Sequence, residues 1–191
     1  MNAKLNEVHE AIRARRSIGK MRDEAPPRDA IERIIEAGTW APFHKVTEPW
    51  RFVVVSGAAR SRLGEIAART VDLTGIPAQA HEAVRAKERG RFERAPYVVV
   101  VIVAPADNPI DFEENYASAA AATQNMLLAA HAEGLAAYWR TGRLAREPEI
   151  LKELEIAEGE RIAAFLYLGY PALVPKQATR APVSEKTRWI T

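Results

Sequence analysis

The segment that most constrains the fold is the apolar run Tyr97–Val103, in which every residue is aromatic or β-branched. Such residues favour β-strands, and a run without polar alternation is typical of a strand buried on both faces. Ile162–Leu168 is a second uninterrupted apolar run. A sheet whose central strands are buried on both faces needs helices on each side.

Segments with helical spacing of apolar residues alternate along the chain with shorter strand-like runs. Helices are expected from about residue 5 to 16, 29 to 38 (with Asp29 or a neighbour as N-cap and Gly38 as the stop), 58 to 69, within 79 to 94, 115 to 133 and 148 to 154; further strands are expected at 51–55 and 135–139. Residues 39–49 and 107–112 are expected to be loops, and 172–191 a disordered tail or an arm that lies on another surface. The interleaving indicates an α/β or α+β class with a mixed sheet, and 191 residues suggest one domain, 1–191.

Composition narrows the possible functions. The chain has no cysteine, which excludes disulfides, thiolate nucleophiles and iron–sulfur ligation, so a bound cofactor would have to carry electrons in any redox reaction. A net charge of +2 argues against nucleic acid as the main partner. The four histidines are scattered, so no metal site is expected. No apolar run is long enough for a membrane span and no signal peptide is visible, so a cytoplasmic location is expected.

A first candidate site is Arg15-Arg16-Ser17, at the end of the first expected helix. Two guanidiniums and a hydroxyl are hydrogen-bond donors with the geometry to hold a phosphate. The alternative is a solvated helix terminus, where cations also suit the helix dipole. The local sequence alone favours this second interpretation.

Two further segments carry candidate residues. The loop between Pro42 and Pro49 contains His44 and Lys45, and Trp40 and Trp50 flank it. Either it is a rigid binding loop, or its histidine is simply exposed and its tryptophans cover the edge of the core. Far downstream, Trp139-Arg140-Thr141-Gly142 follows an expected strand and could be an ordinary turn.

In order and spacing, these segments resemble the flavin-dependent nitroreductase family. The resemblance is strongest to a small bacterial subgroup with an Ala-Pro-x-His-Lys/Arg…Pro-Trp loop, and it extends from about Ala11 to about Pro182. It implies an α+β fold, a three-layer α/β/α arrangement around a central mixed, mainly antiparallel sheet. It also implies an entwined homodimer packed across the 115–133 helix, whose first half is rich in small residues, with residues 172–191 as an arm on the partner chain.

The resemblance also implies roles for individual residues. Arg15 and Ser17, with Arg16 next, would hold the phosphate of flavin mononucleotide (FMN), and Arg180 would add a contact from the tail. Trp139, Arg140 and Thr141 would border the flavin ring and ribityl chain, while Trp40 and His44 would approach from the other subunit. Gly19 stands where the family often has a lysine, with Lys20 next to it. Val46 and Glu48 stand where more distant relatives have Asn and Gln, whose amides hydrogen-bond to the flavin ring. The resemblance therefore implies that His44 and Lys45 would make the ring contacts instead.

The resemblance implies an NAD(P)H-dependent oxidoreductase that uses FMN to reduce nitroaromatics, quinones or similar acceptors by ping-pong hydride transfer, without an assigned catalytic side chain. The chain has no G-x-G-x-x-G or P-loop motif, which fits a donor that enters and leaves the flavin site. One alternative is ene reduction or reductive dehalogenation on the same fold, for which only residues 69–94 offer a covering insertion. The other is a flavin-free dimeric binding module.

Overall fold

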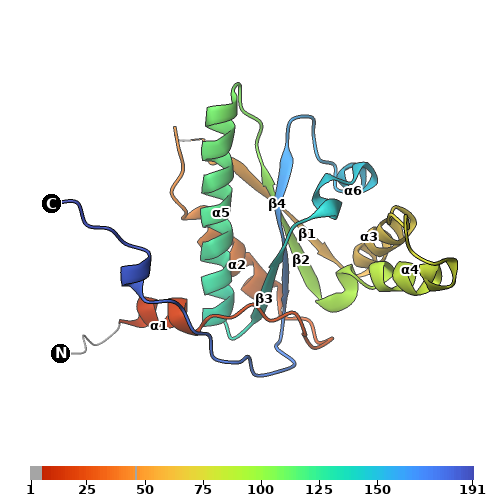
Figure 1. Ribbon diagram of the computed structural model, residues 1–191, viewed down its shortest axis with the longest axis horizontal. Helices are drawn as coiled ribbons and strands as arrows, with labels where there is room; N and C mark the ends of the chain where they lie inside the picture. Colours follow the sequence, from red (N-terminus) through yellow and green to blue (C-terminus); the bar gives the residue numbers. More distant parts are fainter. Residues whose placement is uncertain (1–5, 46) are drawn as a thin grey trace.

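The computed structural model describes residues 6–45 and 47–191. Its α-helices are α1 (Glu7–Ala14), α2 (Arg28–Thr39), α3 (Ala58–Arg69), α4 (His81–Arg89), α5 (Pro109–Ala132) and α6 (Pro148–Glu153), and its strands are β1 (Trp50–Ser56), β2 (Tyr97–Val103), β3 (Ala136–Arg140) and β4 (Arg161–Gly169) (Figure 1). Short 3-10 helices are η1 (Ala78–Ala80), η2 (Phe92–Arg94), η3 (Arg143–Arg146) and η4 (Val183–Glu185). Val46, which belongs to the predicted 39–49 loop, lies outside the described residues. So do residues 1–5, which include the predicted start of the first helix and part of the region considered for a signal peptide.

The four strands form one sheet in the order β1-β2-β4-β3, and each neighbouring pair is antiparallel. The two apolar runs are its central strands β2 and β4, as their composition predicts. A parallel bridge joins Ser17 to Ala137 at the edge of β3, so the chain after α1 extends the sheet by a short mixed element. The predicted α+β class and three-layer arrangement are confirmed.

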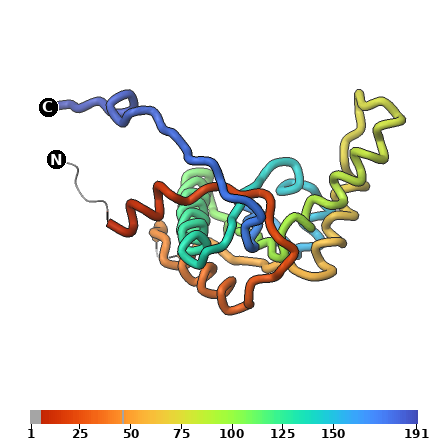
Figure 2. The backbone as a smooth tube through the Cα atoms, turned by 90° about the horizontal axis from the view of Figure 1, so that it is seen from below, coloured from red at the N-terminus to blue at the C-terminus, as the bar shows by residue number. Residues whose placement is uncertain are grey.

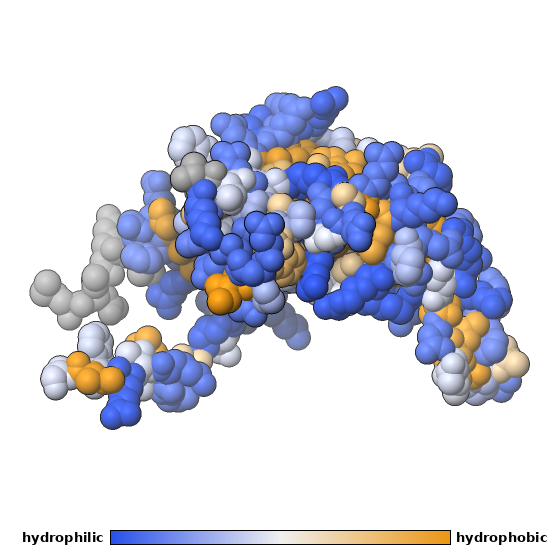
Figure 3. Space-filling view, turned by 90° about the horizontal axis from the view of Figure 1, so that it is seen from above, coloured by the Kyte–Doolittle hydropathy of each residue, from blue (hydrophilic) through white to orange (hydrophobic). Residues whose placement is uncertain are grey.

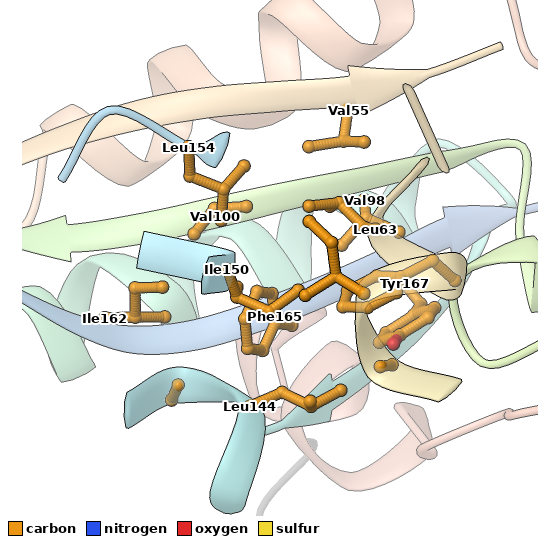
Figure 4. Close-up of a cluster of buried hydrophobic side chains, with 14 of the residues drawn as sticks. Val55, Leu63, Val98, Val100, Leu144, Ile150, Leu154, Ile162, Phe165 and Tyr167 are labelled. Atoms are coloured by element: carbon orange, nitrogen blue, oxygen red, sulfur yellow. The ribbon is translucent and has the colours of Figure 1, made fainter. Parts of the chain in front are cut away.

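Helices cover both faces of the sheet (Figure 1). On one face, α2 and α5 pack over alternate residues of the central strands, among them Val99, Val101 and Leu166. On the other face, α3, α6 and η2 pack over Val98, Val100 and Phe165 (Figure 4). This alternation within single strands is the period-two pattern of a sheet buried on both sides.

Three details of the sequence interpretation are wrong. Gly38 does not end α2 but lies inside it, where a Cβ atom would stand 2.9 Å from the Met126 side chain of α5; glycine permits this close approach. Asp29 does not cap α2, because it lies within the first turn and the N-cap position is its neighbour Pro27; the Asp29 carboxylate pairs with Arg33 at 2.8 Å. Residues 109–112 are not a loop, because Asn108 caps α5 and Pro109 occupies its first turn, a favoured position for proline.

Two parts of the chain project from the body (Figures 2 and 3). On one side lie α1 and the tail after Pro171, which has no regular structure except η4 and exposes Trp189 and Ile190 almost fully. On the other side lies the hairpin of α3 and α4. The helices of that hairpin cross closely at Gly64, where a Cβ atom would meet the Arg89 carbonyl oxygen at 2.1 Å.

Candidate functional site

The Arg15-Arg16-Ser17 triplet lies where α1 ends and the chain joins the sheet. Arg15 is the C-cap of α1, and its extended backbone leads directly to the bridge between Ser17 and Ala137. The Ile18 amide donates to the Ala137 carbonyl at 3.1 Å, which fixes the register. The triplet is thereby held beside the first residues of β3.

The Arg15 side chain has the electrostatics of an anion-binding group. Its Nη1 atom is buried and has no hydrogen-bond partner among the described residues. Burial lowers the pKa of Arg15, and the charges of Arg16 and Arg180 lower it further. A buried donor without a partner and the repulsion between the three positive charges both destabilise the folded chain. A bound anion would supply the missing acceptor and a negative charge, so this cluster is complementary to an anion.

Arg16 and Arg180, the two charges near Arg15, differ in their hydrogen bonds. Arg16 donates to the carbonyls of Arg13 (2.6 Å), Arg15 (2.7 Å) and Lys176 (3.3 Å), which ties the tail to α1. Arg180, on the exposed tail, donates only to the Thr179 carbonyl at 2.9 Å among the described residues. A cavity of about 230 Å³ adjoins the cluster and is lined by Arg15, Arg16 and the C-terminal end of α5, including His131.

The Trp139-Arg140-Thr141 segment continues along β3 from the same place. Trp139 and Arg140 belong to the strand rather than to a turn, and only Thr141 and Gly142 form the turn, with Gly142 at φ +100°. Trp139 packs on the α5 face. Since Arg140 lies three strand residues beyond Ala137, the segment runs about 10 Å from the arginine cluster.

Trp40 and His44 do not join this group within one chain. Trp40, the C-cap of α2, is 81% exposed, and His44 is exposed in the following loop. Next to it, Lys45 donates to both carboxylate oxygens of Asp111 at 2.8 Å and lowers the pKa of Asp111. The loop is therefore bound to the N-terminal end of α5.

The two groups of candidate residues thus lie at opposite ends of α5. Asp111, beside the loop, and His131, beside the arginine cluster, are twenty residues apart on one helix, which corresponds to about 30 Å. Figure 1 shows the same separation, with the 39–50 loop and α1 at opposite ends of the long helix. The structure brings Arg15, Arg16, Ser17 and Arg180 to the edge strand that carries Trp139 and Arg140, and leaves Trp40 and His44 apart from it.

Sequence reasoning missed three residues near these groups. Asp111 was assigned to a loop, although Asn108-Pro109 is a helix-start signal that could have placed it on α5. His131 gives no sequence signal, because only folding brings it to the cavity beside Arg15. Tyr167 lies within an apolar run, and its position beside β3 depends on strand pairing.

The described residues contain no group of three or more His, Asp or Glu side chains that could hold a metal ion. No helix in the described part of the chain has the length and apolar character needed to cross a membrane.

Comparison with known proteins decides the family. The family model described as "Nitroreductase family" matches residues 12–170. The chain belongs to the nitroreductase family. It is 32% identical over 178 residues to Escherichia coli K12 YdjA, a protein assigned as an NAD(P)H nitroreductase, with 93% of this chain and 94% of YdjA covered.

Solved structures of the nitroreductase family agree with this assignment. A nitroreductase-like family protein from Bacillus cereus superposes with a TM-score of 0.84 at 27% identity, and covers 100% of this chain and 99% of its own. A protein assigned as a nitroreductase from Desulfovibrio desulfuricans, solved in complex with FMN, has a TM-score of 0.76 at 28% identity and covers 98% of this chain and 99% of its own.

Proposed function

We propose that this protein is an FMN-dependent NAD(P)H oxidoreductase that reduces nitroaromatics, quinones or similar electron-poor acceptors. The observation that carries the proposal is the buried, unpartnered Nη1 atom of Arg15, repelled by Arg16 and Arg180, in a chain of the nitroreductase family. A phosphate supplies the charge and the acceptors that this cluster lacks among its own residues. The chain has no cysteine that could carry electrons, and a bound flavin would carry them instead.

Arg15, Ser17 and Arg180 would bind the FMN phosphate, and Arg16, engaged with backbone carbonyls, would hold the tail in place beside them. The ring would lie farther along β3, at the edge of the strand beside Trp139, Arg140 and Thr141, where backbone groups can bond to it. When bound, FMN would accept a hydride from NAD(P)H and pass the electrons to an acceptor that replaces the oxidised nicotinamide. The Arg140 guanidinium would place positive charge near the ring, which favours an anionic reduced flavin.

The site is completed by a second copy of the chain. Because His44 and Arg15 lie at opposite ends of α5, two chains packed antiparallel across this helix would bring the His44 and Trp40 of one beside the arginine cluster of the other. The exposed Ala117 and the half-buried Ala120 offer a small-residue surface for that contact. The tail 172–191, which projects past α5 in Figure 1, would lie on the partner chain.

The test is anaerobic absorption spectroscopy of the purified protein after addition of FMN and removal of free flavin. The expected result is about one flavin per chain, bleached by NADH or NADPH and restored by a quinone or a nitroaromatic. A protein that takes up no FMN would instead be a flavin-free module. A protein that holds FMN that neither nucleotide reduces would have another reaction on this fold.

A further inference from the structure

A second group of basic residues, Arg94 and Arg140, is found near two tyrosines on the face of β3 that points away from α5. Tyr138 of β3 and Tyr167 of β4 are partners in the strand register. Tyr167 belongs to the cluster on the α3 and α6 face (Figure 4), and Tyr138 packs against that cluster. The Tyr167 side chain is only 3% exposed. The ring of Phe92 stacks on it with a centroid distance of 6.3 Å and an interplanar angle of 16°.

The two elements that pack against Tyr167, β3 and η2, each carry an arginine without a partner among the described residues. The half-buried Arg140 lies over the Tyr138 ring, 5.7 Å from its centroid. Arg94 is exposed and ends the same 3-10 turn that carries Phe92 onto Tyr167. Within residues 6–45 and 47–191, neither guanidinium makes a hydrogen bond or an ion pair to a side chain or to the backbone.

Two carboxylates in this part of the chain, those of Glu88 and Glu93, have other partners. Glu88 is buried, forms an ion pair with Arg91 and lies 4.0 Å from Arg143. Glu93, adjacent to Arg94 in the chain, accepts a hydrogen bond from the Ser61 hydroxyl of α3 at 2.8 Å. Neither Glu88 nor Glu93 makes an ion pair with Arg94 or Arg140.

The Tyr167 hydroxyl adds a neutral donor to this group. Burial raises the pKa of Tyr167 to about 12, while the charges of Arg140, Arg91 and Arg94 act in the opposite direction and that of Glu88 adds to the rise. The hydroxyl therefore stays protonated at neutral pH and can donate. One hydroxyl and two guanidinium forks, without a free carboxylate among them, suit a carboxylate or a phosphate.

We propose that Arg94 and Arg140, with the Tyr167 hydroxyl, bind an anionic group on the molecule that exchanges electrons at this site. The inference rests on the proposed function, because Arg140 belongs to the segment assigned to the flavin ring. The anionic group is either a carboxylate on the acceptor or the 2′-phosphate of NADPH. In both cases the two arginines select the redox partner by charge.

The test compares kcat/KM of the FMN-loaded wild type and Arg94→Gln for 4-nitrobenzoate and its neutral analogue 4-nitrobenzamide, each with NADH and with NADPH. Arg85→Gln, the same charge change at an exposed position on α4, is the matched control. Arg94→Gln should lose roughly tenfold or more for the anionic reactant only. A loss confined to 4-nitrobenzoate identifies the acceptor as the source of the anion, and a loss confined to NADPH identifies the nucleotide.

Equal kinetics of Arg94→Gln and wild type in all four combinations, or equal losses in Arg85→Gln, overturn the inference. Thermal unfolding of each variant shows whether the exposed substitutions leave the fold intact. A wild type that reduces 4-nitrobenzamide but discriminates by charge neither between the two acceptors nor between NADH and NADPH overturns this inference alone. A wild type that turns over neither acceptor with either nucleotide overturns the proposed function, and this inference with it.

Discussion

At the scale of single residues, the features that suit Arg15 to binding an anion also lower the stability of the flavin-free fold. Its buried Nη1 atom has no partner among the described residues, and Arg16 and Arg180 repel its charge. A buried donor without an acceptor costs about 1–3 kcal/mol. Arg15 therefore has the character of a residue kept for a ligand at the expense of the flavin-free fold.

We predict that Arg15→Met leaves the thermal stability of the flavin-free protein equal to that of the wild type or higher, because it removes the unpaired donor and keeps the aliphatic stem. Arg60→Met is the contrasting control. Arg60 also has an unpartnered buried atom, but its Nη1 donates to the Ala95 carbonyl at 2.6 Å, so its loss should lower stability. A marked destabilisation by Arg15→Met would mean that Arg15 is a structural residue.

The sequence could predict this site only in part, and the reason is physical. Adjacent arginines and a serine are visible as phosphate donors, but their burial and the missing partner depend on how the chain after α1 docks on β3. The convergence of Arg180 from the tail depends on tertiary contacts as well. Tyr167 and Phe92 become neighbours only through the packing of η2 on β4, which no local pattern encodes.

At the scale of elements, patterns with strong local signals were predicted closely. The range of α3 and that of β2 match their apolar spacing, and Gly134, with φ +73°, follows α5 as predicted. Gly38 was misjudged because a glycine at a helix stop and one at a helix crossing look alike in sequence. Only the structure distinguishes them, through the 2.9 Å approach to Met126.

The crossing of α3 and α4 gives the second prediction. Gly64→Ala should destabilise the protein by about 1–3 kcal/mol, because the added Cβ would meet the Arg89 carbonyl at 2.1 Å and must push the two helices apart. The matched control is Gly90→Ala at the end of α4, whose Cβ would find its nearest neighbour at 3.8 Å. Urea unfolding measures both, and equal stabilities of the two variants would contradict the close crossing.

The third prediction concerns the junction of β1 with the loop before β4. Glu160 accepts from Arg51 Nε at 2.7 Å and Nη2 at 2.6 Å, and also from the Ala157 amide at 2.8 Å. The hydrogen bonds from Arg51 lower the pKa of Glu160, despite the opposing effect of burial. A carboxyl with a lowered pKa stabilises the fold above its unfolded pKa of about 4.3 and loses this contribution as the pH falls through the native value.

Glu160→Gln should therefore cost about 1–3 kcal/mol at pH 7, and its difference from the wild type should shrink below about pH 4.3. Glu32→Gln, in an exposed pair with Arg28, should show little effect at either pH. Urea unfolding at pH 7 and in acid measures the difference. A difference between wild type and Glu160→Gln that does not change with pH would contradict this role of the pair.

At the scale of the whole molecule, the proposed shared site depends on which surface of α5 is free for a second chain. Ala119, Ala122 and Thr123 pack inside the chain, so only part of the small-residue surface recognised in the sequence is free to meet a second copy. The exposed Ala117 belongs to that free part. Ala117→Arg should shift the protein from dimer to monomer in analytical ultracentrifugation at micromolar concentration, with unchanged helix content. A wild type that sediments as a monomer would contradict the shared site.

In the proposed site, the arginine cluster beside β3 binds the phosphate of FMN. The most direct measurement is a titration of flavin-free wild type and Arg15→Ala with FMN and with riboflavin, which lacks the phosphate. We expect Arg15→Ala to weaken FMN binding roughly ten- to a hundredfold, as for the loss of charge-assisted hydrogen bonds, and to leave the riboflavin dissociation constant nearly unchanged. Unchanged FMN affinity, or equal losses for the two flavins, would place the phosphate elsewhere.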